Sequence, residues 1–483
     1  MNQAFSKIWI IVIFIILAGG IFAWQYWQVA KEEIIKEPTL NLIETKLATI
    51  SKKYYPETEG VLLEHVLFSP DGKEATYIIR LREQGKAFAV INGRKSNGYD
   101  ETFNFTFSPN NQRVSYGAER EGKEFMIIDG KESQAYDSVF GLTFSPDNTQ
   151  FAYPAKKEGK ELMVINGTES EFYDYVGNPI FSPDSKNIAY VARKEGNWFV
   201  IINGEKSKDY YRCGVPVFSP DSKRIAYPTK KTEQKGEWFM VIDGEENKID
   251  GVVLTVDLLT FSPDSKKIAY FVSKLKEEKF LWVPVVNGKE GEKGYAGIET
   301  LTFSPDSQRI AYIVSEGKKN IVVDGEESKP YDWANPPTFS SDGKNISYIS
   351  YTGYTGWPKE WFTVINGKEE KTPYNYIYDL IFSPDGQRIA YIAGKEEKEF
   401  VVINNKEGVG YFAIDELVFS PDSKHFAYKA LKEREGQWFM VIDGKEGRAY
   451  DEIFTPIFSS DGKYLAYGTR SGNELWWRVD KIE

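Results

Sequence analysis

Short apolar segments alternate with polar turns through most of the chain, and residues 217–250 show the pattern in full. A tight turn, Ser219–Ser222, leads into a mostly apolar segment at Arg224–Tyr227. A charged loop follows, and then a second apolar segment at Trp238–Ile242. No helical periodicity intervenes, so the pattern predicts short strands joined by tight turns.

The turns carry specific chemistry. In Ser219-Pro220-Asp221-Ser222, proline pre-sets φ and the aspartate can bond its own backbone, while other copies place glycine last. Asparagine or aspartate followed by glycine is typical of a type I′ hairpin, which needs positive φ twice. Such pairs begin at Asn92, Asp129, Asn166, Asn203, Asp243, Asn287, Asp324, Asn366 and Asp443, with Asn404-Asn405 as a variant. Two hairpins per unit predict four antiparallel strands: A, turn, B, loop, C, turn, D.

The unit repeats eleven times at spacings of 36 to 43 residues. Its opening phenylalanine stands at 68, 107, 144, 181, 218, 261, 303, 339, 382, 419 and 458. A period in this range marks solenoids, propellers or arrays, and four antiparallel strands in about 40 residues form a propeller blade. The predicted fold class is therefore all-β, a β-propeller.

The repeated phrase resembles the TolB-type, WD40-like propeller repeat, as in FSPDSKRIAY at Phe218–Tyr227 and FSPDGQRIAY at Phe382–Tyr391. The resemblance covers residues 68–480. It implies a propeller fold but leaves function open, because blades of this family serve translocation scaffolds, peptidase gating domains and some lyases.

Eleven blades exceed the usual four to eight, which favours two tandem rings over one large ring. The step from the C–D turn to the next phenylalanine is longest between Gly244 and Phe261, so a boundary is expected there. We expect an anchor over 1–30, a linker over 31–60, a five-blade propeller over 61–250 and a six-blade propeller over 251–483. The last unit lacks strand D. A strand within 47–60 could supply it, although Leu40, Ile43, Leu47 and Ile50 have helical spacing.

The uncharged run Ile8–Trp24 predicts a transmembrane helix. Lys7 precedes the run, and Gln25, Tyr26 and Trp27 suit the membrane interface, so we expect the amino terminus inside and the body outside the cytoplasm. A cleaved signal peptide is the alternative, but apolar residues continue past the small residues Ala18–Gly20. Both alternatives predict an exported body, and the uncleaved anchor, which we favour, places it at the cell membrane.

Charge and composition exclude several functions. The formal net charge of −11 disfavours nucleic acid as a partner. One cysteine, Cys213, and two histidines, His65 and His425, leave no set for a zinc site, a histidine-dependent lyase or a Ser-His-Asp triad. The repeated turn aspartates could suggest calcium but are more simply turn residues. No metal, cofactor or catalytic residue is predicted.

One remaining feature indicates a binding face. Strand D often ends in Tyr-Asp, and these pairs should share a rim with the charged B–C loops, facing a protein or a cell-surface polysaccharide. The pairs are Tyr99-Asp100, Tyr136-Asp137, Tyr173-Asp174, Tyr331-Asp332 and Tyr450-Asp451. Packing of the tyrosine between blades, with the aspartate capping a turn, is the structural alternative. We expect a non-catalytic scaffold; a carbohydrate-active enzyme using clustered carboxylates and a simple spacer are the alternatives.

Overall fold

The computed structural model describes residues 45–49, 61–68, 75–81, 86–91 and 94–482, except 111, 234–236, 277 and 354–359. The predicted membrane segment Ile8–Trp24 lies outside these residues. Within them the chain forms strands and turns only, and none of the described segments is a helix able to span a bilayer. The all-β prediction is confirmed.

The strands form eleven sheets, numbered here as blades 1 to 11 in chain order. Six blades have a continuous first strand. They are blade 1, β2 (Val61–Phe68), β3 (Ala75–Leu81), β4 (Lys86–Ile91) and β5 (Arg94–Lys95); blade 2, β6 (Glu101–Phe107), β7 (Val114–Arg120), β8 (Lys123–Ile128) and β9 (Lys131–Glu132); blade 6, β25 (Val253–Phe261), β26 (Ile268–Lys276), β27 (Lys279–Val286) and β28 (Lys289–Glu290); blade 7, β29 (Gly297–Phe303), β30 (Ile310–Ser315), β31 (Lys319–Val323) and β32 (Glu326–Glu327); blade 9, β38 (Tyr376–Phe382), β39 (Ile389–Lys395), β40 (Lys398–Ile403) and β41 (Lys406–Tyr411); and blade 10, β42 (Ala413–Phe419), β43 (Phe426–Leu431), β44 (Trp438–Ile442) and β45 (Lys445–Tyr450).

In the other five blades the first strand is split into two pieces. They are blade 3, β10 (Ser138–Val139), β11 (Thr143–Phe144), β12 (Phe151–Lys157), β13 (Lys160–Ile165) and β14 (Thr168–Glu169); blade 4, β15 (Tyr175–Val176), β16 (Ile180–Phe181), β17 (Ile188–Lys194), β18 (Asn197–Ile202) and β19 (Glu205–Lys206); blade 5, β20 (Arg212–Cys213), β21 (Val217–Phe218), β22 (Ile225–Lys230), β23 (Trp238–Ile242) and β24 (Glu245–Ile249); blade 8, β33 (Trp333–Ala334), β34 (Thr338–Phe339), β35 (Ile346–Thr352), β36 (Glu360–Ile365) and β37 (Lys368–Thr372); and blade 11, β46 (Glu452–Ile453), β47 (Ile457–Phe458), β48 (Tyr464–Ser471) and β49 (Glu474–Lys481), with β1 (Thr45–Thr49).

The split has a local cause. Pro179, Pro216, Pro337 and Pro456 fall in four of the five gaps, and proline has no N–H to donate to a ladder. Five of the six continuous first strands instead carry a β-bulge about three residues before the repeat phenylalanine, where the ladder shifts register. In four of them the bulge residue has a left-handed backbone: Asn104, Leu258, Asp379 and Glu416.

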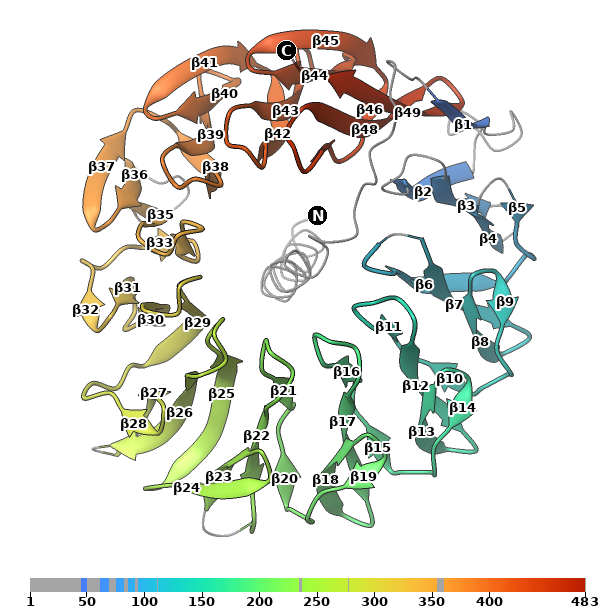
Figure 1. Cartoon of the computed structure of the whole chain (residues 1–483), viewed down its shortest axis with the longest axis vertical. Helices are drawn as coiled ribbons and strands as arrows, with labels where there is room; N and C mark the ends of the chain where they lie inside the picture. The colour runs from blue at the N-terminus through green and yellow to red at the C-terminus, as the bar shows by residue number, and fades with distance from the viewer. Residues whose placement is uncertain are drawn as a thin grey trace.

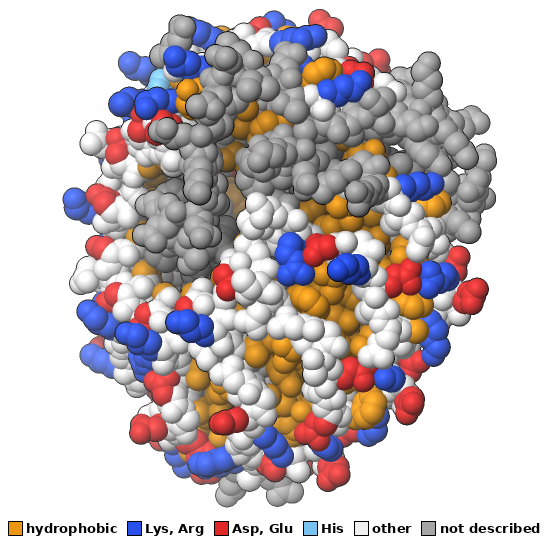
Figure 2. All heavy atoms as spheres, turned by 45° about the vertical axis from the view of Figure 1, so that its right-hand side comes forward, with side chains coloured by type: hydrophobic (Ala, Val, Ile, Leu, Met, Phe, Trp, Pro, Cys, Tyr) orange, Lys and Arg blue, Asp and Glu red, His pale blue; other side chains and the backbone are white. Residues whose placement is uncertain are grey.

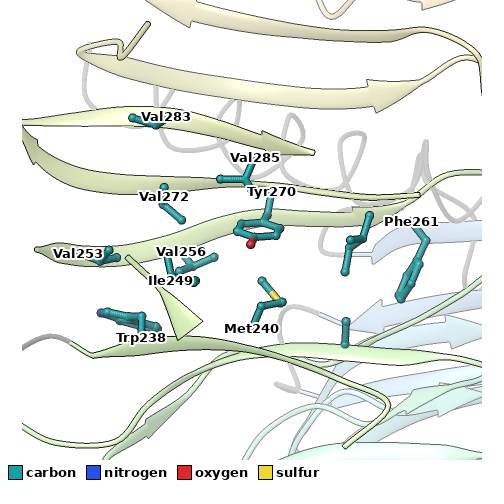
Figure 3. Close-up of a cluster of buried hydrophobic side chains, with 12 residues drawn as sticks. Trp238, Met240, Ile249, Val253, Val256, Phe261, Tyr270, Val272, Val283 and Val285 are labelled. Carbon is teal, nitrogen blue, oxygen red and sulfur yellow. The ribbon is translucent and has the colours of Figure 1, made fainter. Parts of the chain in front are cut away.

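The eleven blades follow one another around a single ring, with first strands toward its interior and last strands toward its outside (Figure 1). The predicted boundary near residue 250 is therefore wrong. One apolar core joins blades 5 and 6 across it, with Trp238, Met240 and Ile249 packed against Val256, Tyr270 and Val272 (Figure 3). The extra residues between Gly244 and Phe261 lengthen β24 and β25 rather than forming a linker.

The amino-terminal strand closes the ring. Strand β1 pairs antiparallel with β49 and supplies the outermost strand that the last unit lacks, with Thr45 opposite Trp477 and Thr49 opposite Glu474. Lys46 forms an ion pair with Glu474. This confirms a strand as the missing element, although it begins at residue 45 rather than 47.

The cores lie between blades. The alanine of the Ile-Ala-Tyr segment is fully buried at Ala189, Ala226 and Ala311, which lets the neighbouring sheet approach closely. The tyrosine that follows it meets a tyrosine from the preceding blade edge to face, 6.4 Å apart between ring centroids for Tyr136 and Tyr153. Stacked sheets therefore hide both faces of each blade.

Candidate binding face

The ring has two faces with different chemistry. Arg113, beside the A–B turn, pairs with Asp129 of the C–D turn at 2.9 Å, and Arg309 pairs with Asp324 at 2.8 Å. The A–B and C–D hairpins therefore share one face, here called the turn face. The B–C loops and D–A connections form the opposite face, here called the loop face. The predicted division of the connections between two rims is confirmed.

Turn-face aspartates hold blades together. In blade 5 the Ser219 hydroxyl donates to Asp221 at 2.6 Å, while the Asp221 N–H donates to the Ser265 hydroxyl of blade 6 at 2.9 Å. The same link joins blades 3 to 4, 4 to 5, 6 to 7 and 9 to 10. In these five blades the repeated aspartate is thus both a turn residue and a link to the next blade.

The predicted contact tyrosines are not at the surface. The five tyrosines of the Tyr-Asp pairs, Tyr99, Tyr136, Tyr173, Tyr331 and Tyr450, are only 2–4% exposed. The hydroxyls of Tyr99 and Tyr331 donate to Glu132 and Glu369 of the next blade at 2.9 and 2.7 Å. Burial raises the pKa of all five phenols. Their assignment to a binding surface is therefore corrected: they pack between blades.

The paired aspartates lie on the loop face and cap its hairpins. Each accepts an N–H from the B–C hairpin of the following blade: Glu121 to Asp100, Gly159 to Asp137, Glu195 to Asp174, Gly353 to Asp332 and Gly472 to Asp451. Lys123 also pairs with Asp137 at 2.7 Å and is the main reason that the pKa of Asp137 is lowered. These carboxylates are largely committed to the fold.

Exposed apolar side chains gather on the loop face instead. An apolar arc runs over blades 4 to 6 and consists of Tyr175, Tyr211, Val215, Val252 and Leu254, each 40–66% exposed. These residues occupy D–A connections, the starts of first strands, or the gap in the first strand of blade 5. On the side of the ring shown in Figure 2, apolar side chains likewise lie between charged ones. Exposed apolar groups in one sector mark an interaction surface.

An aromatic and cationic row crosses blade 4 within this arc. Tyr175 lies opposite Arg193, and Arg193 lies opposite Trp198, on three neighbouring strands. The Tyr175 and Trp198 rings are 5.2 Å apart, and the Arg193 guanidinium lies 5.4 Å from the Trp198 ring. Trp198 packs against Tyr210 and Cys213 of the next core, so the row borders the junction with blade 5.

An acidic group lies on the first strands of blades 9 and 10. Asp379 occupies the bulge of β38, and Asp415 and Glu416 occupy that of β42. Protein atoms around the Asp379 carboxyl displace water and raise its pKa, although the side chain keeps some exposed surface. The negative charges of Asp415 and Glu399 raise this pKa further. Lys429 neutralises part of the charge, at 3.1 Å from both Asp415 and Glu416.

Cys213 and His425 have structural surroundings. Cys213 is buried, and burial raises the pKa of its thiol to about 12. His425 takes the place of the turn-face arginines, with Nδ1 2.6 Å from Asp443. His65 lies in β2. In the described part of the chain, no three histidine, cysteine, aspartate or glutamate side chains are arranged to hold a metal ion.

Comparisons with known proteins concern the fold. No family model and no curated protein match the chain. Among solved structures, a putative TolB from Agrobacterium tumefaciens is 18% identical with a TM-score of 0.25, covering 49% of this chain and 92% of that one. The propeller domain of the Trilobed protease from Pyrococcus furiosus is 15% identical with a TM-score of 0.30, covering 57% and 99%. A crystal structure described as the eukaryotic initiation factor is 13% identical with a TM-score of 0.38, covering 77% and 100%. These similarities concern the fold alone, and the β-propeller that the repeat predicted is the fold that the strands form.

Sequence reasoning placed the Tyr-Asp pairs beside the B–C loops, where they lie, but the tyrosines that it offered as contact residues are buried between blades. The signal for the arc was available. Tyr175 follows the Tyr-Asp pair of blade 4, and Tyr211 takes the place of the aspartate in blade 5. Positions that differ from one repeat to the next are not held to one residue type by the packing between blades. They are therefore where a function specific to this chain should lie.

Proposed function

We propose that this protein is a membrane-anchored, extracytoplasmic scaffold that binds a protein or a surface glycan through its loop face and catalyses no reaction. The observation that carries the proposal is the apolar arc of blades 4 to 6. It remains open to solvent, while the buried tyrosines and the turn aspartates are committed to holding blades together. A ring with an exposed apolar arc suits partner binding.

The anchor and the orientation rest on the sequence of residues 1–30. The apolar run supplies the membrane segment and the charge beside it supplies the orientation. A reporter enzyme that is active only after export, fused after Glu483, tests both. Activity in the membrane fraction supports the proposal, and activity confined to the cytoplasm contradicts it.

Site-specific photo-crosslinking tests the binding face. A photoreactive phenylalanine at Val215 should give one discrete adduct in native membranes, because that side chain is 66% exposed in the arc. The matched control places the same group at Lys266, which is exposed on the turn face, and should give no such adduct. Adducts of equal yield at both positions, or none at Val215, would contradict the proposal.

A second candidate is an enzyme acting on a cell-surface carbohydrate. Asp379 favours it, because a carboxylic acid with a raised pKa beside a second carboxylate is the pair that glycoside hydrolysis uses. Release of reducing ends from purified surface polysaccharide, abolished in Asp379→Asn, would establish this activity. Release that persists unchanged in the variant would exclude the Asp379 group as its source.

A further inference from the structure

Blade 4 holds a cation without a counter-charge. Arg193 makes no ion pair with any carboxylate in the described structure, and its buried Nε has no hydrogen-bond partner there. The nearby Asp174 carboxylate is already occupied by Lys160 at 2.5 Å and by the Glu195 N–H at 2.8 Å. The guanidinium is therefore held beside the Trp198 ring with donors to spare.

In blade 11 the arginine at the equivalent position has the ion-pair partner that Arg193 lacks. Arg470 lies opposite Glu452, as Arg193 lies opposite Tyr175, and Arg470 pairs with Glu452 at 3.1 Å. Replacement of the acid by an exposed tyrosine leaves Arg193 without this partner. The aromatic ring instead forms a platform beside the charge.

Blades 3 and 5 also carry a basic side chain in this row that has no acidic partner. Lys156 occupies the equivalent position in blade 3, and Arg212 occupies the first-strand position in blade 5. Neither has a carboxylate within ion-pair distance among the described residues, whereas many other lysines and arginines are paired, such as Lys157 with Glu169. The loop face of blades 3 to 5 thus carries three cations that no ion pair neutralises, on a chain of net charge −11.

We propose that this row binds a segment of a partner protein that presents a carboxylate beside apolar side chains. The inference rests on the proposed binding function and narrows its partner class. The partner's carboxylate pairs with the Arg193 guanidinium, while the partner's neighbouring apolar side chains cover Tyr175 and the apolar arc. The exposed aliphatic groups of Val215, Val252 and Leu254 favour a protein over a glycan, because sugar rings stack on aromatic faces rather than on branched aliphatic groups.

Peptide selection on the immobilised full-length chain in detergent tests this assignment. Selected twelve-residue peptides should contain Asp or Glu next to an apolar residue. Arg193→Gln should weaken their binding by about tenfold or more, the effect of removing one partner of a charge pair. Arg193→Lys should retain part of the affinity. Arg470→Gln, the matched control, should leave binding unchanged, and the thermal midpoint of Arg193→Gln should equal that of the wild type.

A double-mutant cycle locates the contact. Changing the peptide acid to its amide should weaken binding to the wild type about tenfold but have little further effect on Arg193→Gln. Peptides without an acid, or equal binding to both proteins, would overturn the inference and leave the scaffold function standing. Retardation by polygalacturonate in a gel, lost in Arg193→Gln, would overturn it in favour of a glycan. Failure of every peptide and polysaccharide to bind would overturn both proposals.

Discussion

The backbone N–H of Asp221 donates to the hydroxyl of Ser265 in the next blade, 2.9 Å away. Ser265 is 4% exposed and has φ of 63°, a conformation that costs a residue with a Cβ about 1 kcal/mol. Other copies of the turn place glycine at this position, as at Gly343 and Gly386, and so avoid the strain but cannot form the link. Serine thus accepts backbone strain and gains an inter-blade hydrogen bond.

Substitutions at Ser265 should separate the two effects. Ser265→Ala loses the hydrogen bond and keeps the strain, so the free energy of unfolding should fall by about 1–2 kcal/mol. Ser265→Gly loses the bond and relieves the strain, so its loss should be smaller. Urea denaturation measures both. Equal losses would show that the strain at this position costs nothing, and an alanine variant as stable as the wild type would show that the link contributes nothing.

Two tyrosines at the junction of blades 3 and 4 should behave in opposite ways. Tyr173 is 4% exposed and meets Phe199 edge to face, so Tyr173→Ala should lower the free energy of unfolding by about 3 kcal/mol or more. Tyr175, two residues away, is 40% exposed, so Tyr175→Ala should change stability by less than about 0.5 kcal/mol. It should weaken peptide binding instead. A strongly destabilised Tyr175→Ala would contradict its place on the surface.

Stability should decline in alkaline solution. Burial raises the pKa of Tyr270, Tyr391 and Tyr428 to about 12, against 10.0 in an unfolded chain. Because the unfolded phenols ionise first, the full contribution is present below pH 10 and is lost as the pH rises toward 12. Thermal midpoints between pH 9 and 12 measure the decline. Tyrosine absorbance that titrates entirely near pH 10 in the folded protein would contradict the burial.

Acid should weaken the junction between blades 1 and 2. Hydrogen bonds from Arg120, together with those from Tyr99, lower the pKa of Glu132 to about 2 from 4.5. Its contribution is present above pH 4.5 and is lost as the pH falls toward 2. Glu132→Gln should flatten this part of the stability curve. A variant with the same acid transition as the wild type would show that other carboxylates dominate it.

Ring closure can be locked covalently. Thr49 and Glu474 are opposite each other in the β1–β49 ladder, so Thr49→Cys with Glu474→Cys should form a disulfide under mild oxidation. Thermal stability should then rise and should fall back on reduction. Thr49→Cys with Lys463→Cys is the matched control and should remain unlinked, because these positions are not partners in the ladder. An unlinked first pair would contradict closure by β1.

The repeat made the strands and turns predictable. Positive φ at both Asn166 and Gly167 confirms the type I′ assignment, and Asn404 with Asn405 adopts the same geometry. These are local properties that each copy of the repeat restates. The sequence therefore carried the A–B turn eleven times and the C–D turn ten times.

Ring number and closure depend on contacts between distant segments. The long step before Phe261 has the same length whether the residues form a linker or extend β24 and β25, so it could not decide the ring count. Leu47 fits both a helical spacing and a strand, and only pairing with β49 selects the strand. The tyrosines were misplaced because an aromatic ring at a strand end suits both a surface and a junction between blades.

Electron microscopy of the full-length protein in lipid nanodiscs, averaged in projection along the ring axis, tests the central claim most directly. One closed ring with eleven radial densities and no seam is the predicted result. Two smaller rings, or an open arc with a gap between the first and last blades, would contradict it.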